Sequence, residues 1–409
     1  MWGYAIRFLL FVCLVAFITF DIIFDDQMLI ASAILSLSIQ QWGGKPLEII
    51  GLLFTTFFAY ITLPIMYFHF VYAKNQLLAL YYFYVYGLAT MIGMWLKLAF
   101  YKGRPYVINQ GLSGSTCDPG MPSGHSIIAV CGYYAIHQIV ARELYPNRKT
   151  IKIVSMVVCS LIALCIMVSR ITLGDHGYNQ VIMGFLIGIN VIANVSFDGF
   201  CEYLMKVPKC LKAFLLPIEV FNFSYLILMI AINHYFREDP TLWKYMNKNP
   251  ACKGTFVVGA SIAAPFNSWF IGSFLYYPYR RKEPEGCAFK TVDTWGKFWA
   301  RMGLHLAVTL PLVPLFVLGS FVYSSDLEIF WKAAIIATIA TIGANYLAFA
   351  MVNLSKRVFE KCGVAIPRDY LHADTRAQLE AEKSYVYKTT ELNRDYPHMY
   401  LSSNLSMSP

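Results

Sequence analysis

Charged side chains are scarce in this sequence. Only 14% of its 409 residues are Asp, Glu, Lys or Arg, whereas 57% are hydrophobic and the mean hydropathy is +0.52. A soluble core of this size cannot bury so much apolar surface, so the composition excludes an ordinary soluble globular protein. It predicts an integral membrane protein.

Cysteine patterns that bind metals are missing as well. The ten cysteines include no CxxC pair, and no His/Cys spacing typical of a zinc site occurs. Most of the cysteines fall inside apolar runs, where they behave as small apolar side chains. We therefore expect no structural zinc, no other metal and no cofactor.

Long apolar runs, in contrast, are abundant. A hydrocarbon layer about 30 Å thick needs about 20 apolar residues in helical form. This criterion predicts an all-α, polytopic membrane helical bundle over residues 1–355, followed by a polar tail over residues 356–409. The ten expected transmembrane helices lie near residues 5–24, 46–72, 77–99, 124–141, 151–169, 178–197, 213–235, 255–277, 303–322 and 328–352.

The first run and the tail each allow two interpretations. Residues 5–24, with Arg7 as a charged flank, could be a cleaved secretory signal, but they continue into DIIFDD without a small-residue cleavage pattern. We therefore favour an uncleaved first span. The tail contains one possible short helix, Ala373 to Lys383, and could contact a partner, although a disordered extension is favoured.

The loops between these spans differ in charge. One set, near residues 73–76, 142–152, 198–212 and 278–302 together with the tail, is rich in Lys and Arg. The bias of basic residues towards the inner face predicts that this side, tail included, is cytosolic. Most of the net charge of +9 is then explained by these basic loops, which flank the spans on the cytosolic side. We therefore expect no nucleic-acid partner.

The opposite loops, near residues 25–45, 100–123, 170–177, 236–254 and 323–327, should face a lumen or the outside. Two cysteines, Cys117 and Cys252, fall in these loops, where oxidation is permitted. We hypothesise that they form a disulfide. A pair of glycines, Gly184 and Gly188, is instead typical of close helix packing.

Polar residues gather at the edges of four expected spans. If the span count is right, WLKLAFYKGRPY, DPGMPSGHS, VSR and LGDHGYNQ all fall on one side of the membrane. A lysine or histidine at a membrane edge is individually most often structural. Together, three cations and two histidines at one depth would repel one another unless an anion lies among them, which predicts a phosphate site. The residues concerned are Lys97, Arg104, Ser123, His125, Arg170 and His176.

These residue types fit phosphoryl chemistry. The guanidinium groups of Arg104 and Arg170 match phosphoryl oxygens bidentately, and Lys97 adds a point charge. Ser123 is a plausible helix N-cap, and the amides after it, with no side chain on Gly124, can approach an anion. Of two imidazoles, a neutral one can attack phosphorus while a protonated one donates to the leaving oxygen, so no metal is required.

The spacing of these residues resembles the three-part signature of the type 2 phosphatidic acid phosphatase (PAP2) superfamily. The matching elements are KLAFYKGRP, PSGH and SRITLGDH. The resemblance implies that His176 is the nucleophile that forms a phosphohistidine and that His125 is the general acid. It assigns phosphate binding to Lys97, Arg104, Ser123, Gly124 and Arg170.

One position departs from the common superfamily pattern, which places Asp four residues after the nucleophile. Here it is Gln180, whose amide oxygen could still orient the ring of His176, because residues four apart share a helix face. Asp175 is a weaker candidate for this role, since adjacent residues do not face each other.

With Gln180, CDPGMPSGH and SRITLGDHGYNQVIMG, the chain is most similar to glucose-6-phosphatase catalytic subunits. This similarity implies nine spans and an active site in the endoplasmic reticulum lumen, to which the first run, near residues 5–24, would be an addition.

We therefore expect a membrane phosphatase for a phosphomonoester, with glucose 6-phosphate or another sugar phosphate favoured. The alternatives are a lipid phosphate phosphatase of the same superfamily and a catalytically silent structural subunit. A vanadate haloperoxidase and a transporter are less favoured, because the former are generally soluble and the cluster lies at a membrane edge rather than the midplane. Expected partners are the substrate, membrane lipids, and a sugar-phosphate transporter or other membrane subunit.

Overall fold

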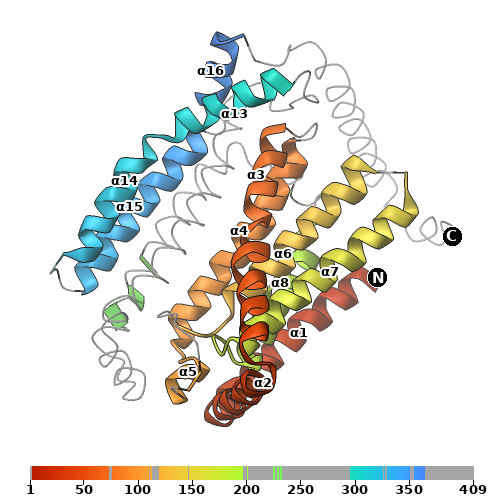
Figure 1. The fold of residues 1–409 in the computed structure, drawn as a ribbon, viewed down its shortest axis with the longest axis vertical. Helices are drawn as coiled ribbons and strands as arrows, with labels where there is room; N and C mark the ends of the chain where they lie inside the picture. Colours follow the sequence, from red (N-terminus) through yellow and green to blue (C-terminus); the bar gives the residue numbers. More distant parts are fainter. Residues whose placement is uncertain are drawn as a thin grey trace, which may run out of the picture.

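We describe a computed structural model of the chain. The structure describes residues 2–72, 76–109, 111–112, 119–145, 147–196, 200, 224–225, 228–229, 231–232, 295–325, 327, 329–350 and 354–363. In these ranges every regular element is a helix (Figure 1). The all-α expectation is therefore confirmed for the described part of the chain.

The N-terminal segment forms two helices that pack on the centre of the bundle. Helix α1 (Trp2–Ile23) lies against α8 (Tyr178–Asn194), and α2 (Asp25–Leu53) lies against α7 (Lys149–Thr172). Helix α2 continues through the short π-helix η1 (Phe54–Phe58) towards α3 (Thr62–Tyr72). The bounds of α1 agree with the first expected span.

The loop expected near residues 25–45 is wrong, because α2 is helical from Asp25 onwards. The segment is helical although it has two acidic residues at its start and GGKP near its middle, and its residues Ala33 and Leu37 pack against Tyr106 and Leu112. The helix is kinked at Gly44, whose φ of 55° is easily adopted only by glycine. The apolar segment from Asp25 to His69 spans 45 residues, more than twice the length needed to cross a bilayer.

The central bundle contains α4 (Gln76–Phe100), α6 (Gly124–Gln138), α7 and α8, with the short α5 (Pro105–Ile108) after α4 and the π-helix η2 (Ile139–Leu144) after α6. Helix α6 contacts α4, α7 and α8. Its contact with α8 is close because Gly184 and Gly188 face it: a Cβ on Gly184 would lie 2.5 Å from the carbonyl oxygen of Ser123. The expected packing role of this glycine pair is confirmed.

The C-terminal helices form a second group on one side of the molecule (Figure 1). Helices α13 (Trp295–Thr309) and α14 (Leu312–Ser324) are bent by 42° at the break between them. Helix α14 packs on α15 (Ile329–Phe349), and α16 (Ser355–Lys361) packs on α13. The span expected near 255–277 and the tail beyond residue 363 lie outside the described residues, and so does the span expected near 213–235 except for residues 224–225, 228–229 and 231–232.

Several helices are suited to a membrane. Within the described ranges, four are long and apolar enough to cross one, or five if the bent pair counts as one span. On α7 the side facing away from the bundle exposes Val154, Leu161 and Leu164, whereas Cys159 and Ala163 on the other side are buried. An apolar outer face is expected where lipid is the solvent. The chain is therefore a membrane protein on composition and helix length, while the expected count of ten spans is not confirmed.

Candidate active site

The first motif leaves α4 through a sharp turn. Tyr101 adopts a φ of 53°, which is rare for a residue with a side chain, and its ring is buried. The turn brings Arg104 to the start of α5, where Pro105 occupies the first helical position and lacks the N–H that would have no partner there. Lys97 lies in the last turn of α4 and is 2% exposed.

The second motif forms the start of α6. Ser123 is the N-cap with extended backbone, and its hydroxyl accepts a hydrogen bond from the amide of Ser126 at 3.4 Å. The expected cap is thus confirmed. A Cβ on Gly124, the first helical residue, would meet only the Cε atom of Met94, at 3.6 Å. Packing therefore does not demand glycine here.

The third motif is the turn between α7 and α8. Gly174 has a φ of 69°, and a Cβ on it would approach Leu112 to 3.1 Å. The turn brings the amide of His176 to the carbonyl oxygen of Arg170, which it contacts at 3.1 Å. Both side chains are buried at 1% exposure. The five residues between Arg170 and His176 thus form a turn that this backbone hydrogen bond closes.

The imidazole of His176 has a distinct partner on each nitrogen. Its Nδ1 lies 2.8 Å from the carbonyl oxygen of Gly120 and 3.2 Å from Oε1 of Gln180. Its Nε2 lies 3.0 Å from Nη1 of Arg104. A guanidinium can only donate and the two oxygens on the other side can only accept. The arrangement therefore selects the tautomer with the proton on Nδ1 and a lone pair on Nε2.

Gln180 ties the histidine to the first motif. Its Nε2 donates to the carbonyl oxygen of Gly103 at 2.7 Å, while its Oε1 also accepts from the amide of Gly177 at 3.2 Å. The amide of Ser123 in turn donates to the backbone oxygen of Gln180 at 2.9 Å. The single residue thus contacts all three motifs. A carboxylate at this position could not donate to Gly103.

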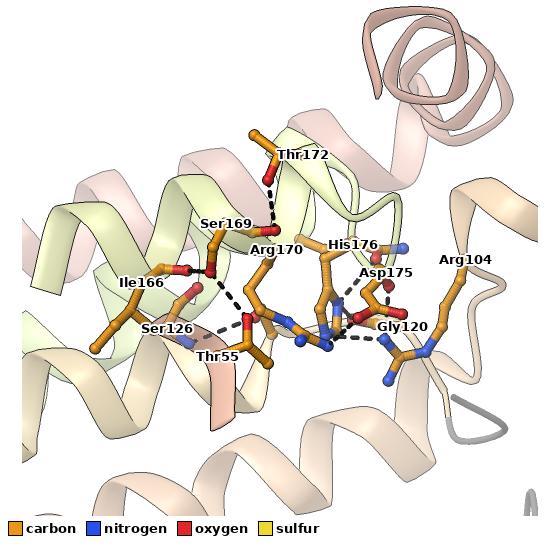
Figure 2. A network of polar contacts seen from close by, with 12 residues as sticks. Thr55, Arg104, Gly120, Ser126, Ile166, Ser169, Arg170, Thr172, Asp175 and His176 are labelled. Atoms are coloured by element: carbon orange, nitrogen blue, oxygen red, sulfur yellow. Dashed lines mark hydrogen bonds and ion pairs between the residues drawn. The ribbon is translucent and has the colours of Figure 1, made fainter. Parts of the chain in front are cut away.

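Figure 2 shows Arg104 and Arg170 reaching His176 from two sides. Nη1 of Arg104 donates to the backbone oxygen of Asp175 at 2.6 Å. The carboxylate of Asp175 lies 2.9 Å from Nη2 of Arg170. Asp175 therefore anchors both guanidinium groups. The weaker expectation that its carboxylate orients His176 is not supported by these contacts.

The charges around His176 change its protonation. The residue lies between α7 and α8, outside the membrane-spanning segments, and burial lowers its pKa well below the usual value of 6.5. The positive charges of Arg104 and Arg170 lower this pKa further, and Lys97 and His125 add smaller effects in the same direction. His176 is therefore neutral around pH 7.

Glycine at position 120 is required by close approach. A Cβ there would lie 2.6 Å from both amide atoms of Gln180 and from the carbonyl oxygen of Gly103. The amide of Gly120 donates to the backbone oxygen of Lys102 at 2.8 Å. Gly120 was missing from the candidates named from sequence, because a backbone carbonyl carries no sequence signal.

His125 lies one residue after Gly124 and is half-buried. Its ring packs edge-on against Tyr60, with ring centroids 5.4 Å apart. Tyr60 lies two residues after the end of η1, and π-helical turns are frequent at functional sites. The same region contributes Thr55, whose hydroxyl lies 2.9 Å from that of Ser169 next to Arg170. Neither Tyr60 nor Thr55 was a candidate from sequence.

The remaining expectations concern cysteines and metals. The proposed partners Cys117 and Cys252 both lie outside the described residues. In the part of the chain that the structure describes, no group of three His, Cys, Asp or Glu side chains is placed to hold a metal ion.

One of three comparisons with known proteins gives a match. Residues 78–197 match the family model of the PAP2 superfamily, which covers α4 to α8 and all three motifs. Comparisons with curated proteins and with solved structures found no match. Helices α1 to α3, the π-helix η1 and helices α13 to α16 lie outside the matched range.

Proposed function

We propose that this chain is a membrane phosphatase that hydrolyses a phosphomonoester through a covalent phosphohistidine on His176. The observation that carries the proposal is the lone pair on Nε2 of a neutral, buried imidazole that is held against Arg104. A nucleophile that stays unprotonated among cations is suited to attack an anionic phosphoryl group. The match to the PAP2 superfamily supports a phosphatase-type activity.

In the first step, Nε2 of His176 attacks phosphorus and the bond from phosphorus to the ester oxygen breaks. His125 donates its proton to that oxygen, which leaves as an alcohol. Nδ1 keeps its proton, so the phosphorylated ring is cationic and is stabilised by the carbonyl of Gly120 and the amide oxygen of Gln180. The guanidinium groups of Arg104 and Arg170 and the ammonium group of Lys97 neutralise the transferring phosphoryl group.

In the second step, water attacks the phosphorus of the phosphohistidine and forms a new bond between oxygen and phosphorus. His125 now accepts a proton from this water. The bond between nitrogen and phosphorus breaks, its electron pair returns to Nε2 of His176, and inorganic phosphate leaves. The amides at the start of α6 after Ser123 add a positive helix end to the phosphate site. An open approach at Gly124 supports this placement.

The favoured substrate is glucose 6-phosphate or another sugar phosphate. This choice rests on the resemblance of the third motif, with Gln180, to glucose-6-phosphatase catalytic subunits. Lipid phosphates are the second candidate class, because a site at the end of membrane helices is accessible from both water and lipid. In the third alternative, a silent structural subunit, the buried cations would serve stability alone.

We place the site on the luminal face of the endoplasmic reticulum membrane and the tail in the cytosol. The basic loops on the opposite side support this orientation. A luminal site for a cytosolic sugar phosphate would require a transporter, so a sugar-phosphate transporter is a candidate partner. The proposed disulfide between Cys117 and Cys252 would lie on the luminal side.

The experiment that tests this function measures phosphate release by the purified protein from a panel of sugar phosphates and lipid phosphates. Repeating the assay in sealed vesicles with a membrane-impermeant sugar phosphate on one side reports the face on which the site opens. The proposal predicts hydrolysis that His176→Ala abolishes, faster with sugar phosphates and only on the luminal face. No hydrolysis of either class would favour the silent subunit.

A further inference from the structure

The first apolar helix contains an aspartate, Asp21, which the proposed mechanism does not use. It lies near the end of α1, and its side chain is fully buried. A buried carboxylate is costly unless it is paired and hydrogen-bonded. Here both oxygens have partners: Oδ2 lies 2.8 Å from Nζ of Lys102, and Oδ1 accepts from Nδ2 of Asn179 at 2.6 Å.

Both partners belong to the catalytic motifs. Lys102 lies between Lys97 and Arg104 in the first motif. Its Nζ also lies 2.9 Å from Oδ1 of Asp25 at the start of α2. Two carboxylates thus neutralise this lysine, so its charge is directed at the N-terminal helices rather than at a phosphate.

The backbone of Lys102 leads from this ion pair to the nucleophile. Its carbonyl oxygen accepts the amide of Gly120 at 2.8 Å, and the carbonyl oxygen of Gly120 contacts Nδ1 of His176 at 2.8 Å. The ion pair that fixes the side chain of Lys102 therefore also fixes the backbone to which Gly120 is bonded. This backbone holds the carbonyl oxygen of Gly120 against Nδ1 of His176. Arg104, which contacts the other ring nitrogen, follows two residues later.

Asn179 provides the second connection. It is buried in the first turn of α8, directly before Gln180, and its Oδ1 lies 3.4 Å from the hydroxyl of Ser32 on α2. The contact with Asp21 therefore fixes the start of α8, where Gln180 bonds Nδ1 of His176. One carboxylate on α1 thus holds two of the three motifs.

We propose that Asp21 is a positioning residue for His176 and that α1 is part of the catalytic unit, although it lies outside the range that matches the family model. Asp21 acts through Lys102 and Asn179 and does not contact the substrate. This inference rests on the proposed function, because its effect is measured on phosphoryl transfer.

The test compares Asp21→Asn with Asp26→Asn in the full-length protein reconstituted in nanodiscs. Asp26 is exposed on α2, and its substitution makes the same charge change at a residue for which no hydrogen bond or ion pair to Asp21, Lys102 or Asn179 is found. Because small displacements of reacting groups slow catalysis strongly, we expect Asp21→Asn to lower kcat by about tenfold or more with KM nearly unchanged. Asp26→Asn should leave both constants unchanged.

A rescue experiment separates positioning from a general loss of folding. Lys102→Gln leaves the Asp21 carboxylate buried without its ion pair, so it should lower kcat further than Asp21→Asn does. The double variant Asp21→Asn with Lys102→Gln should recover part of the activity lost by Lys102→Gln alone, per folded molecule. Additive losses, or equal kcat for Asp21→Asn and Asp26→Asn, would overturn the proposal.

Binding of orthovanadate, followed by thermal shift, distinguishes this proposal from the proposed function. Vanadate takes the geometry of a phosphoryl group in transfer and requires no turnover, so Asp21→Asn should weaken its binding while Asp26→Asn should not. If the wild-type protein hydrolyses nothing and binds no vanadate, the proposed function fails and the positioning role fails with it. A wild-type chain whose intact mass shows that α1 has been removed would also overturn the role of Asp21.

Discussion

Nδ1 of His176 lies 2.8 Å from the carbonyl oxygen of Gly120. Because that oxygen can only accept, the proton of the neutral ring is held on Nδ1 and the lone pair is left on Nε2. In the PAP2 pattern that this chain resembles, an aspartate four residues after the nucleophile has this task. Here a backbone carbonyl and the neutral amide of Gln180 perform it, which leads to a specific prediction for each group.

Gln180→Glu should reduce activity and move its pH dependence. The added negative charge favours the imidazolium and raises the pKa of His176, and a carboxylate oxygen would face the carbonyl of Gly103 where Nε2 now donates. Since only the neutral ring attacks, the acid limb of kcat/KM should move to higher pH, by about one unit for about 1.4 kcal/mol of charge interaction. The exposed Gln27→Glu on α2 is the control, and an unchanged limb in Gln180→Glu would contradict the account.

Arg170→Gln should damage catalysis in two ways. It removes a cation that keeps the pKa of His176 low and a donor to the phosphoryl oxygens, so kcat/KM should fall about 10²- to 10³-fold. The acid limb of the remaining activity should lie at a higher pH than in the wild type, because the pKa of His176 is raised when the cation is removed. Steady-state kinetics from pH 5 to 9 measure both effects, with the exposed Arg142→Gln as the matched control. Wild-type kinetics in Arg170→Gln would exclude the assigned role.

Two glycine substitutions should separate folding from phosphate access. In Gly120→Ala the new Cβ overlaps Gln180 and Gly103, so the free energy of unfolding should fall by about 1–3 kcal/mol. In Gly124→Ala the Cβ meets only Met94 at an ordinary distance, so stability should be retained while phosphate binding is obstructed. Thermal unfolding and kcat/KM measured together give the comparison. Wild-type activity in Gly124→Ala would show that the phosphate does not bind against residue 124.

Tyr60→Ala should impair leaving-group protonation selectively. The ring of Tyr60 packs against His125, so its removal lets the general acid adopt other orientations. Hydrolysis of an alkyl phosphate should slow, whereas p-nitrophenyl phosphate, whose leaving group needs little protonation, should be hydrolysed at nearly the wild-type rate. Tyr60→Phe keeps the ring and should resemble the wild type for both substrates. Equal slowing of both substrates by Tyr60→Ala would assign Tyr60 to folding alone.

The sequence predicted those parts of the site that depend on residue type and short spacing. The cap at Ser123 and the Gly184 contact with α6 follow from local helix chemistry, and both were found. The carbonyl of Gly120 and the pairing of Asp175 with Arg170 depend on how distant loops meet. Such contacts have no local pattern in the sequence.

The N-terminal segment shows a different limit. Residues 25–45 were expected to form a loop, yet they are helical, and Ala33 and Leu37 in this segment pack against Tyr106 and Leu112. Asp21 was visible as a carboxylate in an apolar run, which usually marks function or pairing. Its partners Lys102 and Asn179 lie 81 and 158 positions away in the sequence, so only the folded chain identifies them.

The most direct measurement is detection of the phosphoenzyme itself. The protein is mixed with a labelled phosphomonoester, quenched in alkali within milliseconds, and mapped by mass spectrometry. The account predicts phosphate on Nε2 of His176, absent in His176→Ala and still formed from p-nitrophenyl phosphate in His125→Ala. Continued hydrolysis by His176→Ala, or a phosphoryl group on another residue, would contradict it.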